Sequence, residues 1–202
     1  MGYLHIDNLY KNTEILMFRE CYALEKIHGT SAHISVKETD PGQIRYFSGG
    51  EKHERFVKLF NEEELLKWLK EMQLGDVSIT IYGEAYGGKQ QGMSKTYGPD
   101  LKFIVFDVKI GETWLSVPDA QKVAECLGLE FVDFERISTD LESIDAAMNK
   151  DSTQAVRNGM GEGHKREGVV LRPLMELRKN NGARIIVKHK REDFRETKTP
   201  RE

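Results

Sequence analysis

Seven short runs of apolar or alternating residues dominate this 202-residue chain. They cover residues 32–37, 43–47, 77–82, 102–110, 129–134, 168–172 and 184–190. Runs of this length and alternation predict β-strands. Because the expected strands outnumber the expected helices and do not alternate with them regularly, the sequence predicts an α+β fold with mainly antiparallel sheets, not a doubly wound parallel sheet.

Only three stretches have helical spacing. Residues 62–73 follow the potential cap Asn61, and residues 119–127 follow Pro118. A third stretch opens with Thr139 and Glu142, which match the spacing of a capping box. These three helices are expected to cover the sheets.

Composition excludes several classes of protein. The chain is 39% hydrophobic and 31% charged, which is typical of a water-soluble globular domain. No apolar run is long enough to span a bilayer, and the N-terminus lacks a signal peptide's apolar core, so no membrane partner is expected. Cys21 and Cys126 are too few and too far apart for a disulfide framework or a zinc knuckle. A reducing, cytoplasmic setting is therefore expected.

Charge is unevenly distributed along the chain. Residues 130–151 contain seven acidic and two basic residues, whereas residues 178–202 contain nine basic and four acidic ones. A basic C-terminal quarter suits an anionic partner such as a nucleotide or nucleic acid, although a solvated charged face explains the same counts. No repeat or long linker-like stretch divides the chain.

A lysine in the segment EKIHGTS is the first candidate for chemistry. Lys26 precedes an expected strand, where a loop would present it at the edge of a pocket, and Gly29 allows close backbone approach to a ligand. A single KxxG pattern recurs by chance. Taken alone, it is better explained as a surface lysine before a turn.

Two further lysines lie near the end of the expected strand at 184–190. In a strand, Lys188 and Lys190 share one face with Ile186, whereas His189 points to the other. Two ammonium groups on an otherwise apolar face need an anion between them, and phosphate supplies one. An edge strand protected by lysines against aggregation is an equally good explanation.

Three carboxylates interrupt or border expected strands. Glu167 lies between basic residues before a strand, where it would bind a hydrated metal ion or the attacking lysine. A surface salt bridge is the alternative explanation. Glu84 is flanked by glycine at a strand end, and Asp107 follows Phe106 in an apolar strand; a turn and the core explain these equally well. The glycine-rich residues 159–163 fail the spacing of known phosphate loops, so they are interpreted as a flexible loop.

Together and in this order, the segments resemble the motifs of the covalent nucleotidyltransferases, which include ATP-dependent ligases and mRNA capping enzymes. KIHG is similar to motif I, YGEAYG to motif III, FIVFDV to motif IIIa, EGVVLRP to motif IV and IIVKHK to motif V. His28 stands where DNA ligases and capping enzymes usually carry aspartate, and KIHGTS is most similar to the RNA ligase 2 type. The resemblance implies that family's fold, with a nucleotide pocket between antiparallel sheets flanked by helices.

The resemblance also implies a covalent mechanism. Lys26 would attack the α-phosphate of ATP, expel pyrophosphate and become lysine–AMP. Lys188 and Lys190 would bind the phosphates and neutralise charge in the transition state. Glu167 would hold Mg²⁺, with Mn²⁺ as a possible substitute, and His28 would act in later steps or shape the pocket.

Further residues would bind the nucleotide. By the same resemblance, Glu84 would bind the ribose hydroxyls and Phe106 would stack on adenine. The backbone at Glu25, with Ile27 close by, would read the edge of the base. The family's motif Ia arginine has no direct counterpart in the segment IRYFSGGE, so Arg45 is the candidate.

The implied substrate is RNA with 5′-phosphate and 3′-OH ends, as in a nicked duplex. Residues 1–191 are expected to form the adenylyltransferase domain and residues 192–202 a charged tail or the start of a linker, without an OB-fold or other C-terminal domain. Self-adenylylation without efficient sealing is expected from such a chain. A DNA ligase, a GTP-dependent capping-type enzyme and a non-catalytic nucleotide- or RNA-binding module are the alternatives. The oligomeric state is left open.

Overall fold

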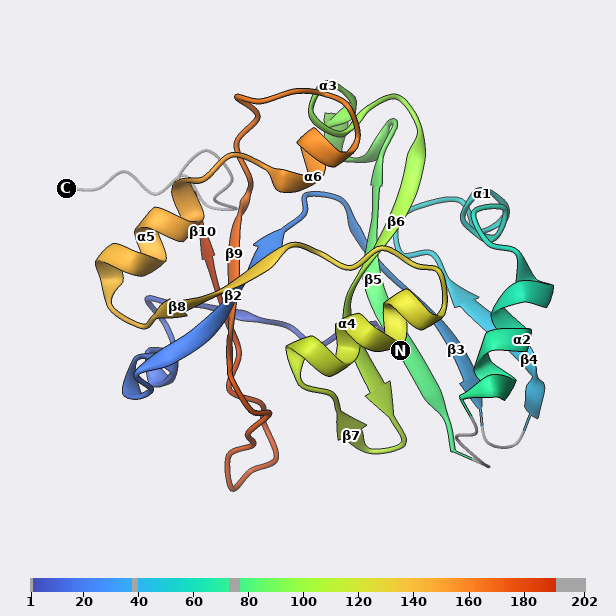
Figure 1. The fold of residues 1–202 in the computed structure, drawn as a ribbon, viewed down its shortest axis with the longest axis horizontal. Helices are drawn as coiled ribbons and strands as arrows, with labels where there is room; N and C mark the ends of the chain where they lie inside the picture. Colours follow the sequence, from blue (N-terminus) through green and yellow to red (C-terminus); the bar gives the residue numbers. More distant parts are fainter. Residues whose placement is uncertain (1, 38–39, 73–76, 192–202) are drawn as a thin grey trace.

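Two five-stranded sheets lie side by side in the computed structural model, which describes residues 2–37, 40–72 and 77–191 (Figure 1). The first sheet has the order β1-β10-β9-β2-β8. Its strands are β1 (Asp7–Asn8), β2 (Glu20–Lys26), β8 (Phe134–Ser138), β9 (Gly168–Pro173) and β10 (Val187–Lys190). Only the short pairing of β1 with β10 is parallel among the described strand pairs of this sheet.

The second sheet has the order β4-β3-β5-β6-β7, and its described strand pairs are all antiparallel. Its strands are β3 (Thr30–Lys37), β4 (Asp40–Phe47), β5 (Ile79–Gly87), β6 (Leu101–Ile110) and β7 (Thr113–Trp114). The predicted α+β class with mainly antiparallel sheets is confirmed. The expected tail at 192–202 lies outside the described residues.

Helices flank both sheets (Figure 1). The α-helices are α1 (His53–Val57), α2 (Glu62–Glu71), α3 (Ser94–Tyr97), α4 (Val117–Cys126), α5 (Leu141–Asn149) and α6 (Thr153–Arg157), and the 3-10 turns are η1 (Glu14–Met17) and η2 (Gln90–Gly92). Helices α1 and α2 contact β4, α4 contacts β6, and α5 packs on the first sheet. Within the described ranges, no helix is both long and apolar enough to cross a membrane.

Helix starts differ from the prediction at two of three places. The Asn61 side chain accepts from the Glu64 N–H at 3.3 Å, as predicted for α2. Helix α4 instead begins before Pro118, with Ser116 as its cap; a proline in the first turn has no helical N–H to lose. Asp140 caps α5, because the Thr139 hydroxyl donates to the Phe18 carbonyl instead.

The strand predicted at residues 129–134 is wrong. This segment crosses between the two sheets and is bonded first to β6 and then to β2. Val105 in β6 donates to the Glu130 carbonyl at 2.8 Å and accepts from Val132 at 2.9 Å, whereas Glu25 in β2 donates to the Asp133 carbonyl at 2.8 Å. Its apolar residues are buried because the segment fills the seam between the sheets.

Strand β2 was not predicted, although it lies inside the first sheet, between β8 and β9. Lys26 is its last residue, so this lysine ends a strand instead of lying in a loop before one. Residues 27–29 then carry the chain across to β3 in the second sheet. The motif lysine therefore lies at the junction of the two sheets.

The core has two parts. The larger cluster includes Ile34, Ile81 and Ile104 of the second sheet together with side chains of α2 and α4. A smaller cluster joins Val169 and Ile144 between the first sheet and α5. The larger cluster also contains Leu24 of β2 and Phe131 and Val132 of the crossing segment, so apolar packing continues into the seam between the sheets.

Three motif glycines allow backbones to approach closely near this seam. A Cβ at Gly29 would lie 2.4 Å from the Ala85 carbonyl oxygen, and one at Gly168 would lie 2.2 Å from that of His189. At Gly83 it would lie 2.2 Å from the Ile104 carbonyl oxygen and 2.5 Å from the Phe103 ring. These glycines are required by space, because real Cβ atoms do not approach backbone oxygens so closely.

We predict that Gly83→Ala lowers the free energy of unfolding by about 2 kcal/mol, because the new methyl group overpacks the β5–β6 pair. Urea denaturation followed by circular dichroism measures this loss. Gly42→Ala in β4 is the matched control, since nothing lies within 4 Å of a Cβ there. Equal midpoints for the two variants would contradict this account of the glycine.

Candidate active site

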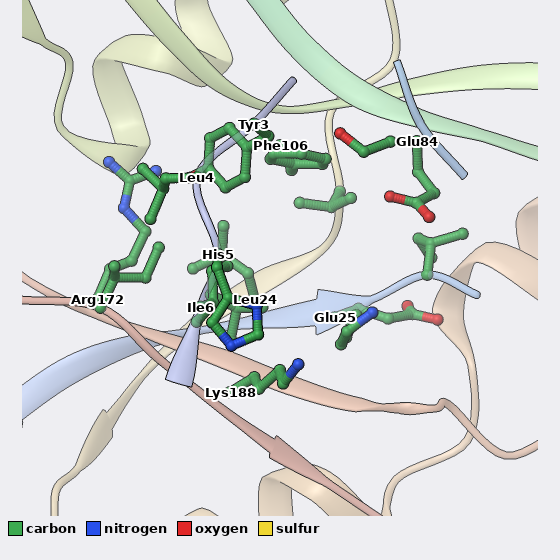
Figure 2. A pocket seen from close by; sticks show the side chains of 16 residues that line it. Tyr3, Leu4, His5, Ile6, Leu24, Glu25, Glu84, Phe106, Arg172 and Lys188 are labelled. Carbon is green, nitrogen blue, oxygen red and sulfur yellow. The ribbon is translucent and has the colours of Figure 1, made fainter. Parts of the chain in front are cut away.

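A pocket of roughly 380 Å³ opens between the sheets (Figure 2). Segments from the N-terminus, β2, β3, β5, β6, β9 and β10, with their flanking residues, form most of its wall. The sequence-predicted residues that line it are Glu25, Lys26, Ile27, Glu84, Phe106 and Lys188. Residues of motifs I, III, IIIa and V thus line the pocket, and Glu167 of motif IV contacts Lys26.

Aromatic and basic groups lie on opposite sides of this pocket. In Figure 2 the rings of Tyr3 and Phe106 lie on one side, and Leu24 and Lys188 lie on the other. The two rings meet edge to face with centroids 4.8 Å apart. This arrangement offers an apolar surface for a planar base and a cation for an anionic group.

The Glu167 carboxylate contacts three side chains of the motifs beside the pocket. Its Oε2 lies 2.9 Å from the Lys26 Nζ and 3.1 Å from the His28 Nδ1, and its Oε1 lies 2.8 Å from the Lys190 Nζ. The carboxylate is 1% exposed. Motifs I, IV and V are thus joined through one buried group.

Electrostatics keep this carboxylate ionised. Burial alone would raise the pKa of Glu167, but the hydrogen bond to His28 and the charges of Lys26 and Lys190 lower it to about 2. At neutral pH the group is therefore an anion that balances the surrounding amines. A carboxylate this weakly basic orients a lysine and is a poor acceptor for its proton.

Glu84 is shifted in the opposite direction. Burial raises its pKa, Lys26 lowers it and the charge of Glu167 raises it; the sum of these effects is a pKa of about 7. A carboxyl that is half protonated near neutral pH both donates and accepts hydrogen bonds. This property suits a partner with hydroxyl groups.

Glu25 has less freedom than the sequence suggested. Its carboxylate accepts from the Ser152 hydroxyl at 2.5 Å and from the Gln154 N–H at 3.3 Å. Its backbone N–H is bonded to Asp133. The backbone amide is therefore already committed, and any contact of this backbone with a base falls to the carbonyl.

Asp107 is fully buried at the inner end of the pocket wall. Its Oδ1 lies 3.1 Å from Arg172 and its Oδ2 lies 2.6 Å from Arg184, while the Tyr3 hydroxyl donates to Oδ2 at 2.7 Å. Both arginines also contact the carboxylate of Glu176. This network connects β6 of the second sheet with β9 and with the N-terminal segment.

Arg45 does not reach the pocket. It lies in β4, two strands away from Glu84, and is exposed. The expected contact of Arg45 with a nucleotide is not supported by this placement, because β3 stands between its strand and the pocket wall. His28, Glu167 and Lys190 adjoin the pocket through Lys26.

Residues at the N-terminus form part of the pocket that sequence reasoning missed. Tyr3, Leu4, His5 and Ile6 line one side of it (Figure 2). No periodicity marks this segment, and the hydrogen-bond partners of Tyr3, Asp107 and Arg184, lie more than a hundred residues away. Arg172 also lines the pocket, and its place at the end of the segment EGVVLR was the available signal.

A divalent cation fits this site only with help from a ligand. In the part of the chain that the structure describes, no group of three His, Cys, Asp or Glu residues is placed to hold a metal. Glu167 is the ionised carboxylate nearest Lys26, and lysines and His28 occupy its oxygens. Magnesium commonly binds through one or two carboxylates, substrate phosphates and water, which is compatible with this donor set.

Comparisons with known proteins agree with this geometry. The sequence model of the RNA ligase family matches residues 19–190. A Naegleria gruberi RNA ligase mutant with ATP and Mn has a TM-score of 0.71 at 14% identity, covering 96% of this chain and 57% of that one. The same enzyme with pyrophosphate has a TM-score of 0.69 at 15% identity, with the same coverage. A search of curated proteins gave no match.

These likenesses establish the fold. An apo mutant of the Naegleria enzyme gives a TM-score of 0.71 at 15% identity. The present chain spans about 57% of the length of these solved structures.

We predict that Glu167 stabilises the fold at neutral pH by about 3 kcal/mol, because its pKa falls from 4.5 to about 2 on folding. This contribution is fully present above pH 4.5 and is lost as the pH falls toward 2. The difference in unfolding free energy between wild type and Glu167→Gln should therefore shrink over this range in urea titrations. Glu112→Gln, at an exposed ion pair with Lys109, is the control and should show little effect. A difference that is independent of pH would contradict the lowered pKa.

Proposed function

Because the chain belongs to the RNA ligase family, we propose that it is an ATP-dependent RNA ligase in which Lys26 becomes adenylylated. The observation that carries the proposal is the position of Lys26. It lines the pocket beside Glu84, Phe106 and Lys188, and it contacts the buried Glu167. A reactive amine, an apolar base site and phosphate-binding cations are thus combined in one place.

In the proposed first step, the deprotonated Lys26 Nζ attacks the α-phosphorus of ATP. A nitrogen–phosphorus bond forms, the bond to the bridging oxygen breaks, and pyrophosphate leaves. Glu167 holds Nζ at the pocket wall by an ion pair while Lys26 is protonated and by a hydrogen bond once the proton has left. When ATP enters, its phosphates take over part of this contact with the lysines.

Lys188 and Lys190 would bind the phosphates from the β10 side. Lys188 lines the pocket, and Lys190 is held 2.8 Å from Glu167, with 8% of its side chain exposed. Cations in such a shielded site stabilise the charge that builds on the phosphates during transfer. A divalent cation at Glu167, Mg²⁺ or Mn²⁺, would add to the same neutralisation when bound.

Glu84 and Phe106 would fix the nucleoside. The pKa of Glu84, about 7, allows it to exchange hydrogen bonds with the ribose hydroxyls, and Phe106 with Tyr3 gives adenine an aromatic wall. Edge and face contacts of this kind orient a planar base. The α-phosphate would then lie toward Lys26.

In the later steps, AMP would pass from Lys26 to an RNA 5′-phosphate. A 3′-OH would then attack that phosphate, close the strand and release AMP. His28, bonded to Glu167, would stay next to the reacting phosphates throughout. Nicked duplex RNA is the proposed substrate.

Incubation with labelled ATP or GTP and Mg²⁺, followed by denaturing electrophoresis, tests the proposal. An AMP adduct supports a ligase, and pre-adenylylated RNA or DNA with a nick then identifies the polynucleotide. A GMP adduct would favour a capping-type enzyme. Absence of any adduct would overturn the enzymatic proposal in favour of a binding module.

We predict that Lys26→Ala forms no AMP adduct, because the substitution removes the amine that lines the pocket and is held 2.9 Å from the Glu167 carboxylate. Intact-protein mass spectrometry should show one added AMP in wild type only. Lys122→Ala, which removes an exposed lysine of α4, should be adenylylated like wild type. An adduct on Lys26→Ala would show that another residue is the nucleophile.

We also predict that Lys188→Ala and Lys190→Ala each slow adenylylation by about a hundredfold or more, because each removes a cation from a shielded phosphate site. Single-turnover rates measured with labelled ATP test this expectation. His189→Ala is the matched control, since His189 points away and contacts Asp145 of α5 at 2.7 Å. Equal losses in all three variants would mean that the substitutions disturb the structure of β10, and that phosphate binding by Lys188 and Lys190 does not explain the slower rate.

A further inference from the structure

A row of aromatic side chains crosses the second sheet on the face that carries Glu84. Phe47, His33, Tyr82 and Trp114 come from β4, β3, β5 and β7. Their ring centroids are separated in turn by 4.9, 5.3 and 5.3 Å. The row is continuous across the sheet, and none of its members lines the pocket.

The two ends of the row differ. At the β7 end, the Arg184 guanidinium lies 4.1 Å from the Trp114 ring centroid, and the Tyr3 ring packs against it. At the β4 end, Phe47 is 39% exposed and stacks on His33 with an interplanar angle of 18°. The described structure therefore covers one end of the row and leaves the other open to solvent.

The inner pair of the row, His33 and Tyr82, lies next to the nucleotide pocket, and Phe47 lies one strand beyond it. Ser31 and Glu84, which both line the pocket, are direct cross-strand partners, and His33 and Tyr82 form the next pair on the same face. Two residues along a strand span about 7 Å. A nucleotide attached to the one in the pocket would reach this pair and Phe47.

His33 shows an unmet hydrogen-bonding capacity in the row. Its Nδ1 is shielded from solvent, yet it has no hydrogen-bond partner within the described residues. Burial lowers the pKa of His33 to about 4, so the ring is neutral at pH 7 and one of its nitrogens can accept a hydrogen bond. Ring stacking on Phe47 therefore holds His33 in the row, and a hydrogen bond of its Nδ1 to another described residue does not.

The surroundings of Phe47 suit a polyanion. Arg45 lies two residues away on the same face of β4 and is exposed. Exposed aromatic rings beside cations are the usual means of binding single-stranded nucleic acid, because every base has a face that can stack. Cross-strand packing explains the inner members of the row, but it does not require an exposed ring at its end.

We propose that Phe47, supported by His33, stacks the terminal base at the RNA end that is being joined, which in a nicked duplex is displaced from its pair. This inference rests on the proposed RNA ligase function and adds to it a binding site beside the adenylylation pocket. Arg45 then serves the polynucleotide backbone. Stacking is sequence-tolerant, so the site would hold the strand end without selecting one base.

Fluorescence titration tests the proposal on the full chain without requiring catalysis. A 5′-phosphorylated RNA carries 2-aminopurine at one end, with an internally labelled RNA as the reference probe. Wild type should quench the terminal label more than the internal one. Phe47→Ala should lose this difference and bind about tenfold more weakly, whereas Phe47→Trp should retain both. Tyr10→Ala, which removes an aromatic ring that is 71% exposed near β1, should behave like wild type.

Each outcome decides the proposal, and thermal melting first establishes that Phe47→Ala is folded. Equal quenching and affinity in Phe47→Ala and wild type would overturn the proposal and leave the exposed ring as a contact for protein. Lack of RNA binding by wild type would overturn it as well. Absence of an AMP adduct on wild type would refute the ligase function alone, since terminal quenching that depends on residue 47 would still establish the stacking site.

Discussion

The buried contact of Asp107 with Arg172 and Arg184 holds the two sheets in the relation that the pocket needs. Asp107 belongs to β6 and Arg172 to β9, so the ion pair spans the seam between the sheets. Two guanidinium groups and two carboxylates, with Glu176 as the second, balance one another away from solvent. Removing one partner would leave a buried charge uncompensated, at a cost of about 3–5 kcal/mol. Phe106 is adjacent in sequence, so its ring is fixed by the same anchor.

Much of the second sheet could be predicted, because its strands bury alternate side chains in one apolar core. The run that became β5 shows this pattern most clearly, whereas β6 was recognised as an apolar run, since it buries Ile104 and Val105 in succession. Strand β2 could not be recognised, because it lies between two other strands and buries Glu25 beside Leu24 and Ala23. A carboxylate that is bonded to Ser152 breaks the alternation that a strand prediction depends on. The segment at 129–133 misled the prediction for the opposite reason, since its apolar residues fill a seam and do not extend a ladder.

The candidate site was predictable where chemistry and strand periodicity coincide. The alternation in β10 correctly separated Lys188 from His189, and the motif order correctly brought Glu167 near Lys26. The wall formed by Tyr3 was not predictable, because it depends on bonds to residues 107 and 184 that no local pattern encodes. The sequence made Arg45 a candidate for contact with the nucleotide, but the residue lies in β4 and does not line the pocket. The order of strands in the sheet determines which strand lies beside the pocket, and the sequence of a single strand does not predict that order.

The Glu167 carboxylate has a consequence for how the site distinguishes anions. This carboxylate already serves as the counter-ion of Lys26 and Lys190. A phosphate that enters the site therefore has to compete with the carboxylate for the two amines. A singly charged anion gains little from such an exchange. A polyphosphate can contact several amines at once and compensates for the contacts it displaces. If the pocket binds ATP as proposed, this internal carboxylate would favour polyphosphates over the singly charged anions of the solvent.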